Sequence, residues 1–252
     1  MYIDSHSHLY SKEFEEDYDL VVQRSLDAKV NKIVLPDIDS TTRGRMLSLA
    51  QKYPDMMFPL VGLHPTSVNH DYKKELALIE KELANNKFYG IGECGVDLYW
   101  DKTYYDEQVK TFEYQLGLAK ELNFPIVIHS RKSTDIVLNI MKKHSRVRGI
   151  MHCFPGDIND AKRAIDMGYL LGIGGVVTFK NSGLQDVVRQ VDVKHLVLET
   201  DAPYLTPVPF RGKRNESSYI PYIAEQISLI KNMNLQEVIT ITTKNAAELF
   251  DI

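Results

Sequence analysis

The chain has 252 residues, of which 44% are hydrophobic and 25% charged, with 14 Gly and 10 Pro. These proportions exclude disordered, collagen-like and low-complexity proteins, and they predict a single globular domain spanning residues 1–252. The formal net charge of −4 argues against a dedicated DNA-coating protein, because it provides no global attraction to phosphates.

Short apolar runs alternate along the chain with longer segments of helical periodicity. The runs predict eight strands, at Tyr2–Asp4, Lys32–Pro36, Phe58–Leu63, Phe88–Glu93, Pro125–His129, Gly149–His152, Tyr169–Ile173 and His195–Glu199. The segments between and after them predict amphipathic helices, at Glu15–Lys29, Thr42–Tyr53, Lys73–Asn85, Tyr105–Leu122, Ser133–Lys143, Asp160–Met167, Gly183–Val191, Ile220–Lys231 and Leu235–Phe250. Such alternation implies parallel strands, and eight units in about 250 residues favour an α/β fold of the (β/α)8 TIM-barrel type.

Neither the N-terminus nor any internal segment resembles a targeting or membrane sequence. MYIDSHSHLY lacks a basic region followed by an apolar run, and no stretch approaches 18 apolar residues. We therefore expect a cytoplasmic protein with no membrane segment, present as a monomer or weak oligomer. Cys94 and Cys153 lie in short apolar segments, which favours reduced thiols over a disulfide.

Two histidines close to the N-terminus have the spacing of a metal-binding pair. His6 and His8 are two residues apart. Alternate residues of a strand lie on one face about 7 Å apart at Cα, so two imidazoles there can converge on one cation. The pair alone is weak evidence, because two such histidines can simply form a polar rim.

More histidines and carboxylates fall where the later strands are predicted to end. They are His64, Glu93, His129, His152 and Asp201, at the third, fourth, fifth, sixth and eighth strands. The carboxyl ends of barrel strands carry the active site in folds of this type. This shared position favours one functional site over unrelated core histidines.

Six of these residues are candidate metal ligands: His6, His8, Glu93, His129, His152 and Asp201. A catalytic zinc ion usually has three protein ligands and a water, so six groups are too many for one ion. We therefore expect two divalent cations, Mg²⁺, Mn²⁺ or Zn²⁺, about 3.5 to 4 Å apart. His6, His8 and Asp201 are assigned to one ion. His129 and His152 are assigned to the other, with Glu93 between the two.

Glu93 and Asp201 are also the predicted catalytic residues. Glu93 is expected to bridge the cations, and Asp201 to orient the attacking water or accept its proton. Asp4 and Asp97 are expected to orient histidines by accepting N–H bonds, although either could instead cap a helix or turn.

Three residues near the predicted strand ends are candidate substrate contacts. Arg131 could bind a phosphate, since its guanidinium matches phosphate geometry, or could be a surface arginine at the start of a helix. His64 could contact phosphate or a metal-bound water, or could be a rim histidine fixed by Pro65. Arg211 lies in a basic loop with Lys213 and Arg214, which could follow phosphates or could merely be solvated.

Aromatic residues gather after the fourth predicted strand, at Tyr99, Trp100, Tyr104 and Tyr105. Aromatic rings can stack on exposed bases, at about 1 to 3 kcal/mol for each base. Packing of these rings against helices is an equally good interpretation.

The motifs DSHSHL, GLHP, GECGVD, HSR, HCF and ETDAPYLTP occur in the order and spacing of a known family. With RGKRNE and TTKNAAELF they cover nearly the whole chain, which therefore resembles the TatD family of metal-dependent deoxyribonucleases. The resemblance implies the same six ligands, His6, His8, Glu93, His129, His152 and Asp201. It further implies an enzyme of the amidohydrolase-like superfamily that cuts DNA, often from the 3′ end of single strands.

The leading hypothesis is thus a metal-dependent hydrolase of DNA phosphodiesters, with single strands or 3′ ends as substrate. The alternative is hydrolysis of a carbonyl substrate, an amide or an aminoacyl-tRNA ester, because the same activated water attacks carbonyls. Arg131 and the basic loop favour the phosphate substrate. A metal-holding scaffold without activity is the least favoured interpretation.

Overall fold

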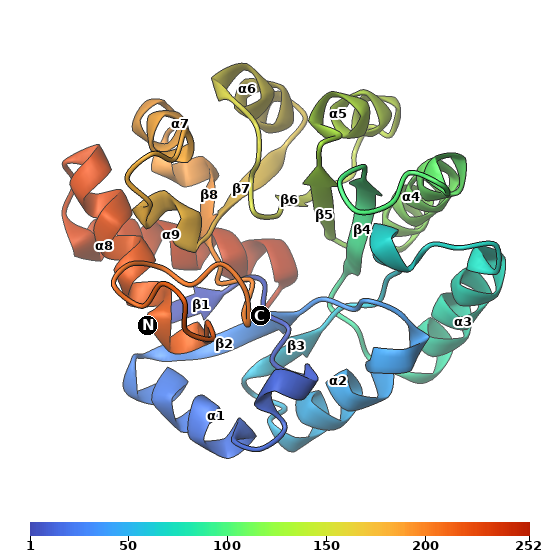
Figure 1. Cartoon of the computed structure of the whole chain (residues 1–252), viewed down its shortest axis with the longest axis horizontal. Coiled ribbons are helices and arrows are strands. Elements are labelled where there is room, and N and C mark those ends of the chain that lie inside the picture. Colours follow the sequence, from blue (N-terminus) through green and yellow to red (C-terminus); the bar gives the residue numbers. More distant parts are fainter.

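The computed structural model describes residues 1–252 and shows strands at the centre with helices around them (Figure 1). The strands are β1 (Tyr2–Asp4), β2 (Val30–Leu35), β3 (Met57–Pro59), β4 (Ile91–Asp97), β5 (Ile126–Arg131), β6 (Gly149–Met151), β7 (Tyr169–Ile173) and β8 (Leu196–Leu198). The helices are α1 (Tyr18–Asp27), α2 (Ser40–Lys52), α3 (Tyr72–Asn85), α4 (Tyr105–Leu122), α5 (Thr134–Lys143), α6 (Ile158–Asp166), α7 (Leu184–Gln190), α8 (Ile220–Lys231) and α9 (Leu235–Phe250).

The strands pair in parallel in two runs, β1-β2-β3 and β4-β5-β6-β7-β8. Two isolated parallel bridges join the runs, Ser7 with Ala202 and Val61 with Ile91. The sheet therefore closes on itself as a (β/α)8 barrel, which confirms the predicted fold class.

Side chains of successive strand residues divide between two apolar cores. In β2, Ile33 and Leu35 belong to a cluster of 55 buried residues that includes the inner faces of the surrounding helices. Val34 lies between them and belongs to a separate cluster of 10 residues with Val127, Ile150 and Val197. Because strand side chains alternate, this second cluster is the interior of the barrel.

Helix α9 closes the amino-terminal end of the barrel. Leu249 and Phe250 belong to the interior cluster, and Asn245 Nδ2 donates to the carbonyl of Leu196, at the start of β8, at 2.8 Å. Thr243 Oγ1 donates to the carbonyl of Met1 at 3.1 Å. With one end filled by this helix, only the carboxyl ends of the strands are available for a site.

Shortening a buried side chain of α9 is expected to destabilise the barrel. Phe250 is 2% exposed, so Phe250→Ala should lower the free energy of unfolding by about 3 kcal/mol through lost burial and a cavity. Leu229→Ala is the control, because Leu229 is 75% exposed and its loss should cost less than about 0.5 kcal/mol. Urea titrations of both variants measure the difference. Equal stability of the two variants would show that α9 does not complete the core.

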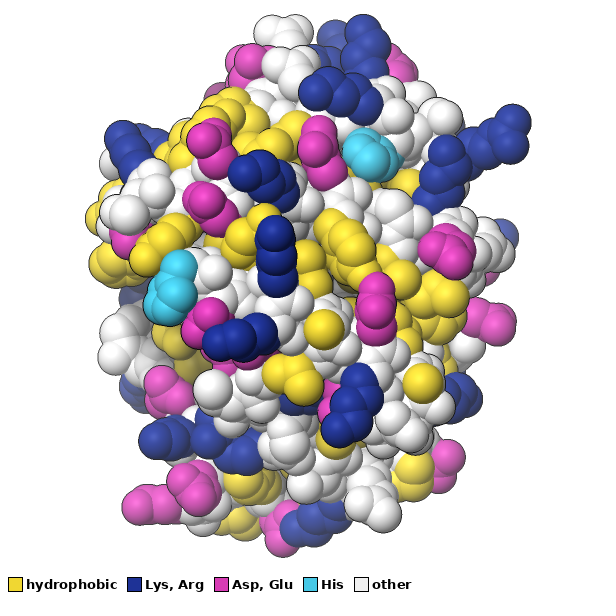
Figure 2. Space-filling view, turned by 90° about the vertical axis from the view of Figure 1, so that its right-hand side faces the viewer, with side chains coloured by type: hydrophobic (Ala, Val, Ile, Leu, Met, Phe, Trp, Pro, Cys, Tyr) yellow, Lys and Arg dark blue, Asp and Glu magenta, His cyan; other side chains and the backbone are white.

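The surface carries no evident basic stripe on the side drawn in Figure 2, where Lys and Arg side chains are interspersed with Asp and Glu. This agrees with the net charge of −4. No helix of the structure is both long and apolar enough to cross a membrane.

Candidate active site

His6 and His8 lie just beyond β1, which ends at Asp4, so their predicted placement on the first strand is wrong. The backbone there bonds to both neighbours, since the Ser7 amide donates to the carbonyl of Val34 on β2 at 3.1 Å and the His8 amide donates to the carbonyl of Ala202, beyond β8, at 2.8 Å. Ser7, between the two histidines, forms the bridge with Ala202. The chain is therefore extended locally, and the i, i+2 spacing still brings both imidazoles to the same side.

Glu93 is turned toward the site by an irregularity in β4. The register of β4 on β5 shifts between Ile91 and Cys94. Beyond the shift, Cys94 and Val96 belong to the outer apolar cluster, and Glu93, which directly precedes Cys94, is buried beside the histidines. A shift of one residue exchanges the two faces of a strand, so this bulge places the carboxylate inside.

One group of four donor atoms converges from the segments that follow β1 and β8 and from Glu93 within β4. His6 Nε2 lies 3.2 Å from His8 Nε2 and 3.1 Å from Glu93 Oε2. His8 Nε2 lies 3.4 Å from the same oxygen, and both nitrogens are 3.7 Å from Asp201 Oδ1. Ligands about 2.0 Å from a tetrahedral zinc ion are about 3.3 Å apart, so the residues present fit a divalent cation.

The other oxygen of Glu93 faces a second group. Oε1 lies 2.9 Å from His129 Nδ1, 3.3 Å from His64 Nε2 and 3.7 Å from His152 Nε2. The His152 ring also stacks on His6, with centroids 3.5 Å apart, and its Nε2 is 3.9 Å from Asp201 Oδ1. The six candidate ligands and His64 therefore form one cluster, with the Glu93 carboxylate at its centre.

Hydrogen bonds define which nitrogen of His8 and His64 carries the proton. Tyr10 Oη donates to the carbonyl of Pro36 at 2.5 Å, so it accepts from His8 Nδ1 at 2.9 Å. The Nε2 lone pair of His8 is then free for a cation. His64 Nδ1 accepts from the Thr66 amide at 3.2 Å, which puts the proton of the neutral ring on Nε2. His64 is thus a hydrogen-bond donor toward the site.

Asp97 and Glu199 orient the two remaining histidines. Asp97 Oδ2 accepts from His129 Nε2 at 2.9 Å, as expected. The sequence assigned no role to Glu199, whose Oε1 lies 3.0 Å from His152 Nδ1 and accepts from the Cys153 amide at 2.6 Å. A Cβ at position 172 would come within 2.2 Å of Glu199 Oε2, so Gly172 on β7 leaves room for this carboxylate. In the sequence, Glu199 could have been noticed as the first residue of the ETD motif, two positions before Asp201.

Asp4 does not orient an imidazole, contrary to the prediction. Its carboxylate accepts from the Thr200 amide at 3.0 Å and from Thr200 Oγ1 at 2.6 Å, and from the backbone amide of His6 at 3.3 Å. These bonds join the end of β1 to the segment after β8. Asp4 therefore fixes the position of the backbone at His6 and beside Asp201.

The acidic groups of the site strongly perturb one another and the histidines. Burial raises the pKa of Glu93, but the nearby His6, His64 and His152 outweigh it and hold the pKa well below its usual range. Burial raises the pKa of Asp201 to about 6. Burial likewise opposes ionisation of Asp97, yet its hydrogen bond from His129 helps to lower the pKa to about 2. Such perturbed groups around one cavity are typical of functional sites.

Comparisons with known proteins establish the family. A family model described as TatD related DNase matches residues 3–251. The chain belongs to this family. It is 41% identical to YabD, a metal-dependent hydrolase of Bacillus subtilis, over 100% of both chains. A relative from Erwinia tasmaniensis, named 3′-5′ ssDNA/RNA exonuclease TatD, is 29% identical over 97% of each chain.

A solved TatD structure agrees with the fold. The crystal structure of the TatD homologue YjjV from Escherichia coli superposes with a TM-score of 0.94 and 28% identity, covering 100% of this chain and 98% of that one. The chain is therefore a metal-dependent hydrolase of the TatD family on a (β/α)8 barrel.

The TatD barrel opens at the site through a cavity of about 830 Å³. Its lining includes His64, Glu93, Arg131 and Asp201. The volume lies within the range of about 300 to 1,000 Å³ that is usual for small-molecule sites. Cys153 also lines it, and both cysteines are free, as predicted.

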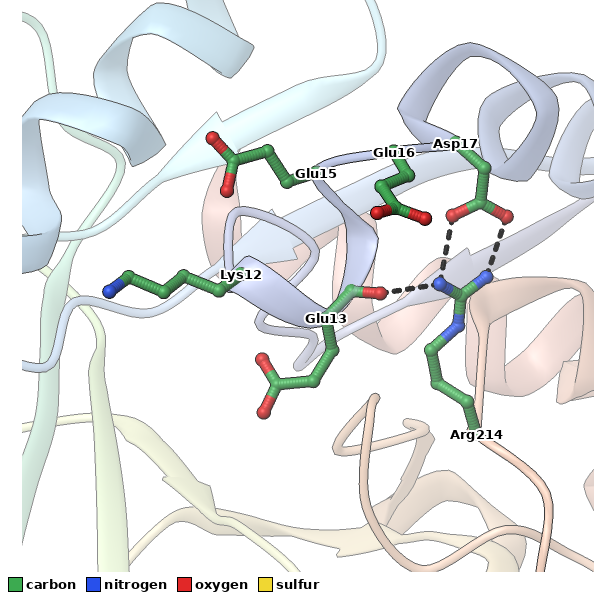
Figure 3. A pocket seen from close by; sticks show the side chains of 6 residues that line it. All are labelled: Lys12, Glu13, Glu15, Glu16, Asp17 and Arg214. Carbon is green, nitrogen blue, oxygen red and sulfur yellow. Dashed lines mark hydrogen bonds and ion pairs between the residues drawn. The ribbon is translucent and has the colours of Figure 1, made fainter.

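The basic loop after β8, with Arg211, Lys213 and Arg214, is partly neutralised by Asp17. Figure 3 shows the Arg214 guanidinium paired with both oxygens of Asp17, at 2.7 and 2.8 Å, and bound to the carbonyl of Glu13. Arg214 therefore holds the loop after β8 against the segment after β1 and is unsuited to following phosphates, one of the two roles considered for this loop. Arg211 instead stacks on Phe179, with 3.8 Å between its Cζ and the ring centroid, and forms no ion pair.

Binding of a cation by His152 is expected to release a proton. Burial lowers the pKa of His152, but the carboxylates of Glu199, Glu93 and Asp201 outweigh it and raise the pKa to about 10. The metal-free ring is then charged at pH 7.5, and cations must compete with its proton. Affinity should rise with pH up to about 10.

Calorimetric titrations of Mn²⁺ at pH 7.5, in buffers of different ionisation enthalpy, measure this release. The heats should differ between buffers, and His152→Gln should release about one proton fewer per protein. Identical proton release by the wild type and the variant would show that His152 binds no cation.

Proposed function

We propose that this protein is a deoxyribonuclease that uses two divalent cations, Mg²⁺, Mn²⁺ or Zn²⁺, to hydrolyse DNA phosphodiester bonds. The observation that carries the proposal is the placement of Glu93, whose Oε2 faces His6 and His8 while its Oε1 faces His129, His64 and His152. His6, His8 and Asp201 would hold one cation with Oε2. His129 and His152 would hold the other with Oε1.

The residues of this site have distinct tasks. Bound cations would lower the pKa of water toward about 7 and neutralise charge on a phosphate oxygen. Asp201 would orient the attacking water and accept its proton, since its carboxylate lies beside both histidines of the first group. His64 would donate its Nε2 proton to a phosphate oxygen. Asp97 and Glu199 keep His129 and His152 in position.

We further propose that the enzyme is a 3′-5′ exonuclease that favours single strands. The name of the Erwinia relative supports this polarity. The charge of Arg131 supports a phosphate substrate, because its guanidinium lines the cavity and pairs with no carboxylate. A neutral amide would make no use of that charge, and an aminoacyl-tRNA ester remains the alternative outcome of the test.

Labelled oligonucleotides test this function. Metal-loaded protein should shorten 5′-labelled single-stranded DNA progressively into a ladder, release mononucleotides early from a 3′ label, and cleave duplex DNA more slowly. His129→Ala should be inactive. No cleavage with Mg²⁺, Mn²⁺ or Zn²⁺, but release of amino acid from aminoacyl-tRNA, would contradict the proposal and favour carbonyl chemistry.

A further inference from the structure

Two large aromatic side chains stand exposed beside the candidate site. Trp100 is 68% exposed and Tyr99 51%, although both follow directly on the buried end of β4. Trp100 is one of the residues that line the 830 Å³ cavity. Aromatic rings left in water at the edge of a cavity are typical of a surface that binds a ligand.

The aromatic pair is held in fixed relation to the metal ligands. Asp97 Oδ1 accepts from the amides of Tyr99 and Trp100, at 2.8 and 3.2 Å. Its other oxygen accepts from His129 Nε2 at 2.9 Å. One buried carboxylate thus positions a candidate ligand and the aromatic loop together, so a ligand resting on the rings lies at a defined distance from the reacting centre.

Arg131 adds a cation to this surface. Its Cζ lies 4.0 Å from the ring centroid of Tyr99 and 5.4 Å from that of Trp100. Asp97 and Arg131 are partners in the β4–β5 register, which keeps the guanidinium next to the loop. A guanidinium stacked in this way keeps its N–H edges available for phosphate oxygens.

We propose that Tyr99, Trp100 and Arg131 form a nucleobase subsite, in which an unpaired base stacks on the Trp100 ring while Arg131 holds the adjoining phosphate. This inference rests on the proposed function and gives it a basis for preferring single strands. A base must leave its duplex partner and neighbours to stack on a side chain, which costs energy in double-stranded DNA. Stacking tolerates all four bases, because each has a π face.

The protein itself supplies a probe for the subsite, because Trp100 is its only tryptophan. The full-length protein in Mg²⁺ is titrated with a phosphorothioate single strand, which resists hydrolysis, and the tryptophan fluorescence is recorded. A base stacked on the indole should change the emission saturably. A matched strand of abasic residues, with the same backbone charge, should leave it unchanged. Equal responses to both strands would overturn the proposal.

Kinetics provide a second, independent measurement. Trp100→Ala should raise KM for single-stranded DNA about 10-fold, as expected for loss of one stacked base, with kcat little changed. Trp100→Phe should restore most of the affinity, and neither variant should alter cleavage of a strand whose terminal nucleotides are abasic. Tyr114→Ala is the control, since Tyr114 is also exposed but lies on α4, bonded to Glu80.

The nucleobase subsite and the nuclease activity can be distinguished by these measurements. If Trp100→Ala changes the cleavage of neither normal nor abasic strands, the subsite is contradicted but the proposed nuclease activity is not. If the fluorescence depends on the bases but the protein cleaves DNA with none of the three metals, the nuclease proposal is contradicted and the nucleobase subsite is supported.

Discussion

Glu93→Gln should remove one of the two proposed cations and reduce DNA hydrolysis at least about 1,000-fold, equivalent to about 4 kcal/mol of transition-state stabilisation. The substitution keeps the shape of the side chain and removes its negative charge. Both groups of histidines converge on this carboxylate, at 3.1 Å from Oε2 and 2.9 Å from Oε1. The amide of Gln has only one oxygen, so it can provide a ligand atom to at most one of the two cation sites, and the bridge between the sites is lost.

The measurement is metal content after equilibrium dialysis, beside initial rates on labelled single strands. Glu121→Gln is the matched control, because Glu121 is an exposed glutamate near the end of α4. It should bind two cations and cleave at the wild-type rate. A Glu93→Gln protein that holds two cations per chain would contradict the bridging role, whatever its activity.

Asp201→Asn should lower kcat about 1,000-fold and leave the fold intact. Asp201 has a φ of 57°, in the left-handed region that Asn adopts as readily as Asp, so the backbone has no reason to move. The amide oxygen can still contact a cation. It cannot accept a proton from water.

Dependence on metal concentration distinguishes the two roles of Asp201. If the residue handles the proton, saturating Mn²⁺ should not restore turnover of the Asn variant. Recovery to near the wild-type rate at high Mn²⁺ would mean that Asp201 acts only as a ligand. Asp55→Asn, at an exposed position, serves as the control for the substitution itself.

The barrel could be predicted because its signals are local. Strands such as Ile126–Arg131 begin with a short run of branched apolar residues, and apolar residues in the helices between the strands recur at spacings of three and four. The strand-end histidines then followed from the geometry of parallel strands. The predicted boundary at Glu93 was too early, because β4 continues to Asp97 beyond the register shift, and a bulge leaves little trace in the alternation of residue types.

The residues that orient the ligands were mostly beyond prediction. Glu199 approaches His152 across 47 positions, and Tyr10 acquires its role by donating to Pro36, 26 residues away. Asp4 is the opposite case: it is close to His6 in sequence, but its side chain accepts a hydrogen bond from Thr200 Oγ1. Tertiary contacts of this kind depend on which strands become neighbours, and residue spacing does not report them.

Two cations that flank the carboxylate of Glu93 should be visible by the anomalous scattering of Mn²⁺ in crystals of the wild-type protein. We expect two peaks about 3.5 to 4 Å apart, one among His6, His8 and Asp201 and the other beside His129 and His152. A single peak at full Mn²⁺ saturation, or peaks that do not contact Glu93, would contradict this arrangement.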